Sequence, residues 1–231
     1  MRRLIAPLKE FGIGAGLLYL LSRALPAVSR RCRLFVYELV VQPVPAQPAR
    51  MMRALRGIEV RELGEDAPEL ARMPVPPAAV AYRLRQGSVC LGAFRRGDFI
   101  GYLWLSFDHY DEDEVRCRFI LSPARVSAFD YDVYLFPEHR LGLAFLALWE
   151  GANRYLRGRD IRQTFSRVSR FNTASRRAHG HLGCQVIGRA LFLRLWRAEL
   201  MLSTLAPYVG ASFRRGARVR LTLHHAPGQR P

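Results

Sequence analysis

The chain has 231 residues, 50% of them hydrophobic and 11% aromatic, which is enough to bury a sizeable core. Its 36 basic against 19 acidic residues give a formal charge of +17, but Lys9 is the only lysine, so a preference for arginine codons accounts for part of the excess. The arginines are dispersed and accompany no nucleic-acid-binding motif, so specific nucleic-acid binding is not expected. The four cysteines form no C-x-x-C, which argues against a zinc knuckle and a disulfide framework and suits a reducing compartment.

Residues 1–50 differ in kind from residues 51–231 and are predicted to form an N-terminal apolar and basic segment with a linker. Arg2, Arg3 and Lys9 precede the apolar run Phe11–Leu21. Eleven apolar residues are too few to cross a bilayer as a helix, which needs about 20. Three interpretations stay open: a signal peptide, a helix lying on an anionic membrane surface, and a helix packed on the domain.

The elements that follow are predicted to be mostly strands. Leu34–Val44 is predicted to be a strand that could extend a sheet, with a proline-rich linker after it. A first domain strand is expected at Ile58–Leu63, followed by short helices within 65–86. Ser88–Phe94 and Phe99–Phe107 read as a hairpin joined at the turn 95–98.

A dense acidic run occupies residues 108–114 and includes Glu112 and Glu114. One interpretation is a solvated hairpin tip whose carboxylates pair with arginines. The other is an electrostatic collar that attracts an acceptor bearing an amine.

A strand, a basic turn and a helix then occur in succession. Phe129–Phe136 is predicted to be a strand closed by Pro137, and apolar residues at helical spacing from Leu141 to Tyr155 predict an amphipathic helix of roughly four turns. The turn 139–142 carries His139, Arg140 and Gly142 at the start of that helix. Unpaired N–H groups, the helix dipole and Arg140 together predict a seat for a pyrophosphate.

A second strand–helix–strand succession follows. Ile161–Val168 is predicted to be a strand, Asn172 a helix N-cap, and Gln185–Leu193 another strand. Asn172, Ser175, His179, Gly183 and Cys184 form the pattern N-x-x-S-x-x-x-H-x-x-x-G-C. A last strand is expected at 217–223, and the adjacent His224 and His225 do not by themselves predict a metal site.

In the order of these motifs, residues 58–205 resemble the GNAT acetyltransferase superfamily, as found in bacteria. In that superfamily the later helix has the pattern N-x-x-A/S-x-x-x-Y-x-x-x-G-F. His179 stands where tyrosine is usual and Cys184 where phenylalanine is usual. The resemblance implies an α/β fold with a mixed, mostly antiparallel central sheet flanked by helices. It also implies acetyl-CoA or another acyl-CoA as donor, held by the following residues: Leu135, Phe136, His139, Arg140, Leu141, Gly142, Leu143, Ala144, Asn172 and Ser175.

The mechanism that the resemblance implies is direct acyl transfer to an amine, without a covalent enzyme intermediate. Backbone N–H groups near Leu135 and Phe136 would polarise the thioester carbonyl. His179 would protonate the leaving thiolate. Asp130 and Asp132, expected on one face of their strand, are candidates for the base together with Glu112 and Glu114.

The acceptor is expected to be a small-molecule amine, or an amine linked to a sugar or a lipid. The expected location is the cytoplasm, with a peripheral position on the inner membrane face if the N-terminal segment binds lipid. Two other functions stay open: an aminoacyl- or fatty-acyl-transferring relative, and an inactive GNAT-like binding module at the membrane surface.

Overall fold

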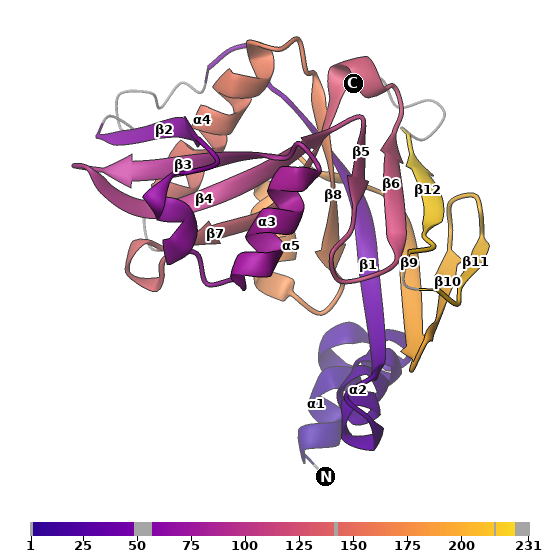
Figure 1. Ribbon diagram of the computed structural model, residues 1–231. Coiled ribbons are helices and arrows are strands. Elements are labelled where there is room, and N and C mark those ends of the chain that lie inside the picture. The colour runs from indigo at the N-terminus through magenta and orange to yellow at the C-terminus, as the bar shows by residue number, and fades with distance from the viewer. Residues whose placement is uncertain (1, 49–56, 141–142, 215, 225–231) are drawn as a thin grey trace. The chain divides into compact units, whose positions relative to one another are not determined.

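The computed structural model describes residues 2–48, 57–140, 143–214 and 216–224. It divides into two compact units, each assembled from separate stretches of chain (Figure 1). Unit 1 contains Met1–Val41, Asp111–Ile120 and Arg167–Gly228, and unit 2 contains Gln42–Tyr110 and Leu121–Ser166. The predicted boundary at residue 50 therefore does not coincide with the boundary between the compact units.

Unit 2 is built on a sheet with the strand order β8-β7-β4-β3-β2. All its described pairings are antiparallel except that of β7 with β8, which is parallel. Arg96 (φ 52°) and Gly97 (φ 89°) form the two-residue turn between β3 and β4, as the hairpin prediction required. The strands span Ile58–Leu63 (β2), Val89–Arg95 (β3), Asp98–Phe107 (β4), Ser127–Leu135 (β7) and Gln163–Ser169 (β8).

Helices cover both faces of the unit 2 sheet, with α3 in front and α4 behind in the view of Figure 1. The helix α4 packs on β2, β3 and β4. Its Gly151 permits this approach, because a Cβ there would lie 2.3 Å from the Val60 Cβ of β2. The helices are α3 (Pro77–Arg85) and α4 (Ala144–Arg157), with short 3₁₀ turns η1 (Pro68–Arg72), η2 (Ala124–Val126) and η3 (Pro137–His139).

Unit 1 carries the strand order β11-β10-β9-β1, in which all described pairings are antiparallel. A smaller sheet places β12 beside β6. The strands span Cys32–Pro43 (β1), Cys117–Leu121 (β6), Gln185–Leu195 (β9), Ala198–Ser203 (β10), Val209–Ser212 (β11) and Val219–Leu223 (β12), while β5 (His109–Asp111) lies at the junction of the two units in the sequence.

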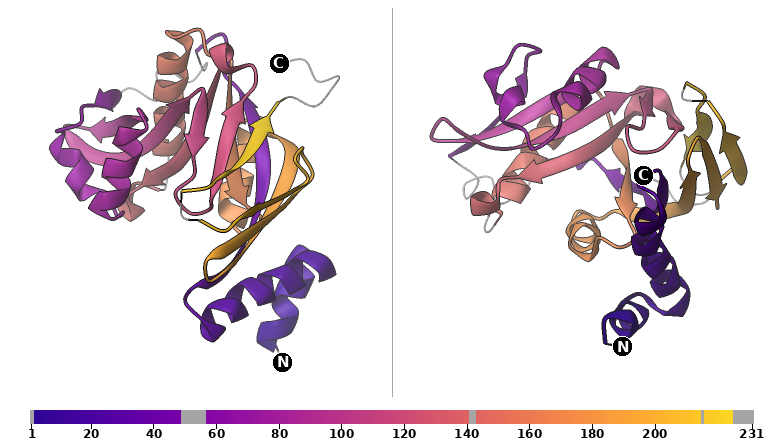
Figure 2. Two further views of the ribbon diagram at one scale, coloured as in Figure 1. Left: turned by 45° about the vertical axis from the view of Figure 1, so that its right-hand side comes forward. Right: turned by 60° about the horizontal axis from the view of Figure 1, so that its bottom comes forward.

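The helices of unit 1 are α1 (Arg2–Phe11), α2 (Ile13–Val28) and α5 (Thr173–His181). α1 and α2 pack on each other as a helical pair (Figure 2). Rings of Phe11 and Tyr19 also contact Phe171 in the segment before α5, with centroids 5.6 and 5.3 Å apart respectively. Within the described ranges, no helix is both long enough and apolar enough to cross a membrane.

The predicted fold class is confirmed: the chain is mixed α/β, with mostly antiparallel strands flanked by helices. β1 extends a sheet as predicted, by pairing with β9. The expectation of a solvated tip at 108–114 is wrong for Glu112, which is only 1% exposed. The N-terminal apolar run is divided between two helices: Phe11 ends α1, which the sequence did not predict, and the run continues in α2 from Ile13.

Candidate active site

The end of β7 offers backbone groups that the sheet does not use. β7 pairs with β8 only over Ser127–Phe129, opposite Gln163–Phe165. On its other side the strand pairs with β4, and the Phe136 N–H donates to the Ile100 carbonyl at 3.1 Å. The Phe136 N–H is therefore occupied by the sheet. Because donors alternate from edge to edge along a strand, the Leu135 N–H points to the opposite edge.

Arg140 lies at this same edge of β7. Its Nε donates to the Leu135 carbonyl at 3.0 Å, and its guanidinium lies 5.2 Å from the Tyr134 ring centroid. The turn between them is closed by the His139 N–H, which donates to the Phe136 carbonyl at 2.8 Å. A fixed positive charge is thus held beside the Leu135 backbone.

The helix α4 begins shortly after this turn without a side-chain cap. Leu143 is its N-cap residue and makes no side-chain hydrogen bond to the helix start, and Ala144 is the first helical residue. An uncapped helix start presents N–H groups and the positive end of the helix dipole, which suits an anion. Two predicted cofactor contacts, Leu141 and Gly142, lie outside the described residues.

Asp132 lies where β7 departs from regular strand geometry. Its φ is 47°, and the register between β7 and β4 shifts there. The carboxylate forms an ion pair with the buried Arg83 of α3 and accepts a hydrogen bond from the Tyr102 hydroxyl at 3.3 Å. Burial, and next the charge of Asp132, raise the pKa of Tyr102. The side chain of Asp132 is 26% exposed, so its negative charge is within reach of solvent.

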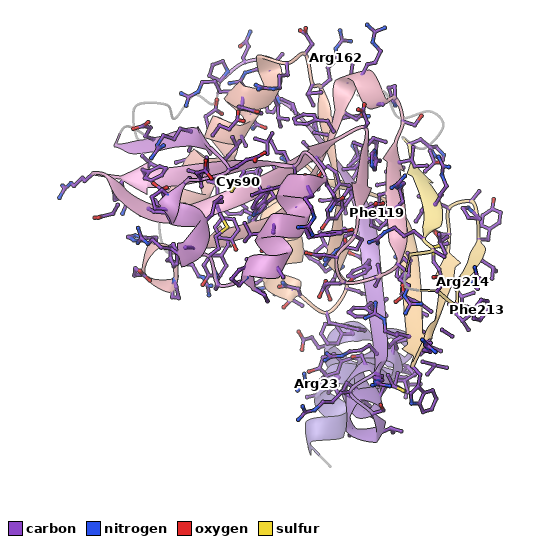
Figure 3. All side chains as sticks on the ribbon, in the orientation of Figure 1. Arg23, Cys90, Phe119, Arg162, Phe213 and Arg214 are labelled. Atoms are coloured by element: carbon purple, nitrogen blue, oxygen red, sulfur yellow. The ribbon has the colours of Figure 1, made fainter. Side chains whose placement is uncertain are left out.

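The aromatic and polar side chains around this ion pair come from three elements. The Arg83 guanidinium lies 5.6 Å from the Trp104 ring centroid and 5.3 Å from that of Tyr131. Cys90 of β3, labelled in Figure 3, is buried near the pair, and burial together with Asp132 raises the pKa of its thiol. Sequence reasoning missed Arg83, because nothing in the pattern of a short proline-flanked helix distinguishes a buried arginine from an exposed one.

Asp130 has different neighbours from Asp132. It is 1% exposed and faces the hydroxyl groups of Thr164 and Ser166 in β8. Burial raises the pKa of Asp130 to about 7, and neither of its carboxylate oxygens has a hydrogen-bond partner among the described residues. The left-handed backbone at Asp132 breaks the alternation of side chains, so the expectation that both aspartates share one face is wrong.

The two predicted glutamates lie in unit 1, where they pair with Arg167. Both oxygens of Glu112 accept hydrogen bonds from Arg167, at 2.9 and 2.8 Å, and burial raises the pKa of Glu112. Glu114 contacts Arg167 at 2.6 Å and accepts from the Tyr37 hydroxyl at 3.1 Å. Glu112 is therefore held in a structural ion pair. Glu114 is half exposed and is the more accessible of the two carboxylates.

The predicted motif on α5 also lies in unit 1. Asn172 caps the helix as predicted, because its Oδ1 accepts from the Ser175 N–H at 3.0 Å. Burial lowers the pKa of His179 to about 4, and its Nδ1 lies 3.5 Å from the Cys184 sulfur. The imidazole is therefore neutral at pH 7, which disfavours the predicted role as an acid.

The predicted site residues thus fall into two sets. The end of β7, Arg140, Asp130, Asp132 and the start of α4 belong to unit 2, whereas Glu112, Glu114 and the α5 motif belong to unit 1. Among the side chains in the described ranges, no group of three or more His, Cys, Asp or Glu could hold a metal ion.

No protein-family model matches the sequence, and no curated protein matches it. Among solved structures, the chain is similar to a protein assigned to the GNAT family as an acetyltransferase, from Novosphingobium aromaticivorans. The TM-score is 0.49 and the identity 17%, over 70% of this chain and 64% of that protein.

Two further solved structures are similar at comparable levels. One is a glucosamine N-acetyltransferase region of a fungal multi-domain β-N-acetylglucosaminidase, with a TM-score of 0.48 and 12% identity over 72% of this chain and 22% of that one. The other is an aminoglycoside N-acetyltransferase in complex with coenzyme A, with a TM-score of 0.41 and 20% identity over 54% and 90%. The chain matches less than two thirds of the length of the first two proteins.

Proposed function

We propose that the chain is an acyl-CoA-dependent N-acyltransferase that transfers an acyl group directly to an amine. The observation that carries the proposal is the end of β7, where the Leu135 N–H points away from β4 and Arg140 bonds the Leu135 carbonyl. The uncapped start of α4 follows within the same unit. Together they offer a donor for a carbonyl oxygen and a seat for a pyrophosphate, in the order that the resemblance to GNAT enzymes implies.

In this mechanism the Leu135 N–H stabilises the charge that develops on the thioester oxygen. Arg140 and the start of α4 bind the phosphates of the donor. The ammonium first loses one proton to a base, and the neutral amine then forms the C–N bond as the C–S bond breaks. The nitrogen loses a second proton, which joins the departing thiolate, so the products are an amide, a thiol and one proton on the base. Asp132, which is partly exposed, attracts the ammonium and is the candidate for that base, whereas Asp130 is 1% exposed and lies on the other face of the strand.

The acceptor class in this proposal is an amine on a small molecule or on a sugar- or lipid-linked precursor. The acyl chain length is left to experiment, so acetyl-CoA and longer acyl-CoA are both candidates. The chain would act in the cytoplasm, where coenzyme A is available. Peripheral attachment to an anionic membrane surface is part of the same proposal, since Ile13, Leu17 and Leu21 follow one another at helical spacing on α2 and are 45–76% exposed.

The test of the transferase proposal is calorimetric titration of the purified chain with acetyl-CoA and a long-chain acyl-CoA, with free coenzyme A as a comparison. We expect micromolar binding and at least a tenfold loss of affinity in Arg140→Glu, because that change places a negative charge beside the phosphates. Arg125→Glu is the matched control, since Arg125 is also exposed and precedes the other end of β7. Absence of binding by the unaltered chain would favour the binding-module alternative.

Membrane attachment is tested separately by sedimentation with anionic vesicles at low salt. Leu17→Glu should release the protein from the vesicles, because it places a charge in the exposed apolar stripe of α2. Equal sedimentation of Leu17→Glu and the unaltered chain would refute attachment through α2 and would leave the transferase proposal untouched.

A further inference from the structure

One face of the β9–β10–β11 sheet in unit 1 is apolar although much of it is exposed. Leu202 pairs with Leu191 on one side and with Val209 on the other. Leu202 is 53% exposed and Val209 is 68% exposed, and Leu200, two residues along the same strand, is 41% exposed. Outward positions of an antiparallel sheet are ordinarily polar, so this face is built for contact with something apolar.

The same face continues into a groove against α2. The groove has a volume of about 390 Å³. Its apolar walls are Ala15 and Leu18 of α2, Val36 of β1, and Leu191 and Leu202 of the sheet. Its size and composition are those of a site for a small apolar ligand or for part of a longer one.

Positive charge lies at the rim of the groove. Arg189 lines it, and its guanidinium has no partner among the described residues. Arg170 also lines it and bonds Glu38 at 2.7 Å, but Glu38 is shared with Arg176 at 2.8 Å, so the three side chains together carry an excess of one positive charge. The hydroxyl groups of Ser203 and Thr204 complete the polar end. An apolar channel with a cationic and hydroxylated rim complements a molecule with a hydrocarbon chain and an anionic head.

We propose that this groove binds the acyl chain of an anionic membrane lipid, with the lipid head group on Arg189. The proposal extends the membrane attachment proposed above from α2 to the sheet, and it rests on that attachment only for the supply of the lipid. Outside the groove, Phe213 projects outward beyond β11 beside Arg214 (Figure 3) and is 68% exposed. Aromatic and basic side chains together are typical of surfaces that lie on anionic membranes.

The experiment measures binding of three lipids, each below its micellar concentration, to the full chain by calorimetry. The lipids are oleate, lysophosphatidylglycerol and the zwitterionic lysophosphatidylcholine, and excess free coenzyme A is present to separate this site from the donor site. We expect the two anionic lipids to bind. Leu202→Glu should lower their affinity at least tenfold, because it places a negative charge in the groove wall. Leu200→Glu is the matched control, since it lies on the same strand face but does not line the groove, and it should bind as the unaltered chain does.

Arg189→Ala tests the rim. It should lower the affinity for oleate and lysophosphatidylglycerol but not for lysophosphatidylcholine. Arg140→Glu should keep lipid binding while it loses acyl-CoA, so that failure of one proposal is distinguishable from failure of the other. Unchanged lipid affinity in Leu202→Glu would overturn the proposal. A dimer detected by light scattering, and dissociated by Leu202→Glu, would overturn it in favour of a second copy of the chain.

Discussion

The buried glutamates of unit 1 and Asp130 of unit 2 differ in their partners. In unit 1, each of the buried side chains Glu38, Glu112 and Glu199 contacts an arginine, at 2.7, 2.8 and 2.6 Å. In unit 2, Glu150 is likewise paired with Arg157 at 2.9 Å, but the buried Asp130 has no hydrogen-bond partner for its carboxylate oxygens among the described residues. An arginine partner offsets the cost of burying a carboxylate and fixes the architecture, whereas Asp130 has no such partner among the described residues and burial raises its pKa to about 7. The difference separates carboxylates held by an arginine from one that is buried without a cation.

The largest effect expected from this contrast is in unit 1. Arg167→Ala should lower the free energy of unfolding by about 3 to 5 kcal/mol, because it leaves the fully buried Glu112 without its cation. Urea denaturation of the variant and the unaltered chain measures the difference. A loss below about 1 kcal/mol would mean that Glu112 is protonated in the folded chain, and that the contrast with Asp130 is false.

The next effect is a pH dependence that originates in unit 2. Between its ordinary pKa of 3.8 and the raised value of about 7, Asp130 holds a proton in the folded chain that the unfolded chain has released. Its contribution to stability is therefore complete below about pH 4 and falls by about 1.4 kcal/mol per pH unit until about pH 7.

Comparison of Asp130→Asn with the unaltered chain isolates this contribution, because the amide cannot titrate. The unfolding free energy of the unaltered chain should decline relative to that of the variant from pH 4 to 7 and then run parallel to it. Parallel curves over the whole range would show that Asp130 is not the titrating group.

A smaller effect concerns the two helix starts. α5 of unit 1 is capped by Asn172, whereas α4 of unit 2 begins at Leu143 without a side-chain cap. Asn172→Ala should cost about 1 kcal/mol, and Leu143→Asn should gain a similar amount. Thermal unfolding of both variants measures these changes, and a loss of stability in Leu143→Asn would contradict the assignment of an uncapped start.

The smallest effect tests the shared pairing of Glu38. Arg176→Ala should cost less than about 1 kcal/mol, since the side chain of Arg176 is 39% exposed and Arg170 still contacts the carboxylate. The double variant with Arg170→Ala should cost several times as much in urea denaturation. If the loss in the double variant equals the sum of the losses in the two single variants, the two arginines do not substitute for each other at Glu38.

The local elements could be predicted from the sequence where periodicity and turn chemistry agree. Ile58–Leu63 has the predicted bounds, and the hairpin turn at 95–98 and the Asn172 cap are also as predicted. The strands β6, β10 and β11 were missed because they are short and β10 has leucines on its outward face. Their strand character depends on their neighbours.

The candidate site was less predictable, because its geometry depends on contacts between distant residues. Arg83 and Asp132 are 49 positions apart, and the φ of 47° at Asp132 has no signature in a run of β-formers. The alternation rule therefore placed Asp130 and Asp132 on one face when the bulge separates them. Likewise, the desolvation that makes His179 neutral follows from packing around α5 and not from its motif.

The stretches of chain that form each unit determine the order in which the two units can fold during synthesis. Most of unit 2 lies in residues 42–166, so it can fold once that stretch has left the ribosome. Unit 1 cannot close then, because β1 at Cys32–Pro43 pairs with β9 at Gln185–Leu195. The N-terminal helices and an unpaired edge of β1 must therefore wait for more than a hundred residues of chain, and during that time the nascent protein is most exposed to chaperones and to premature association.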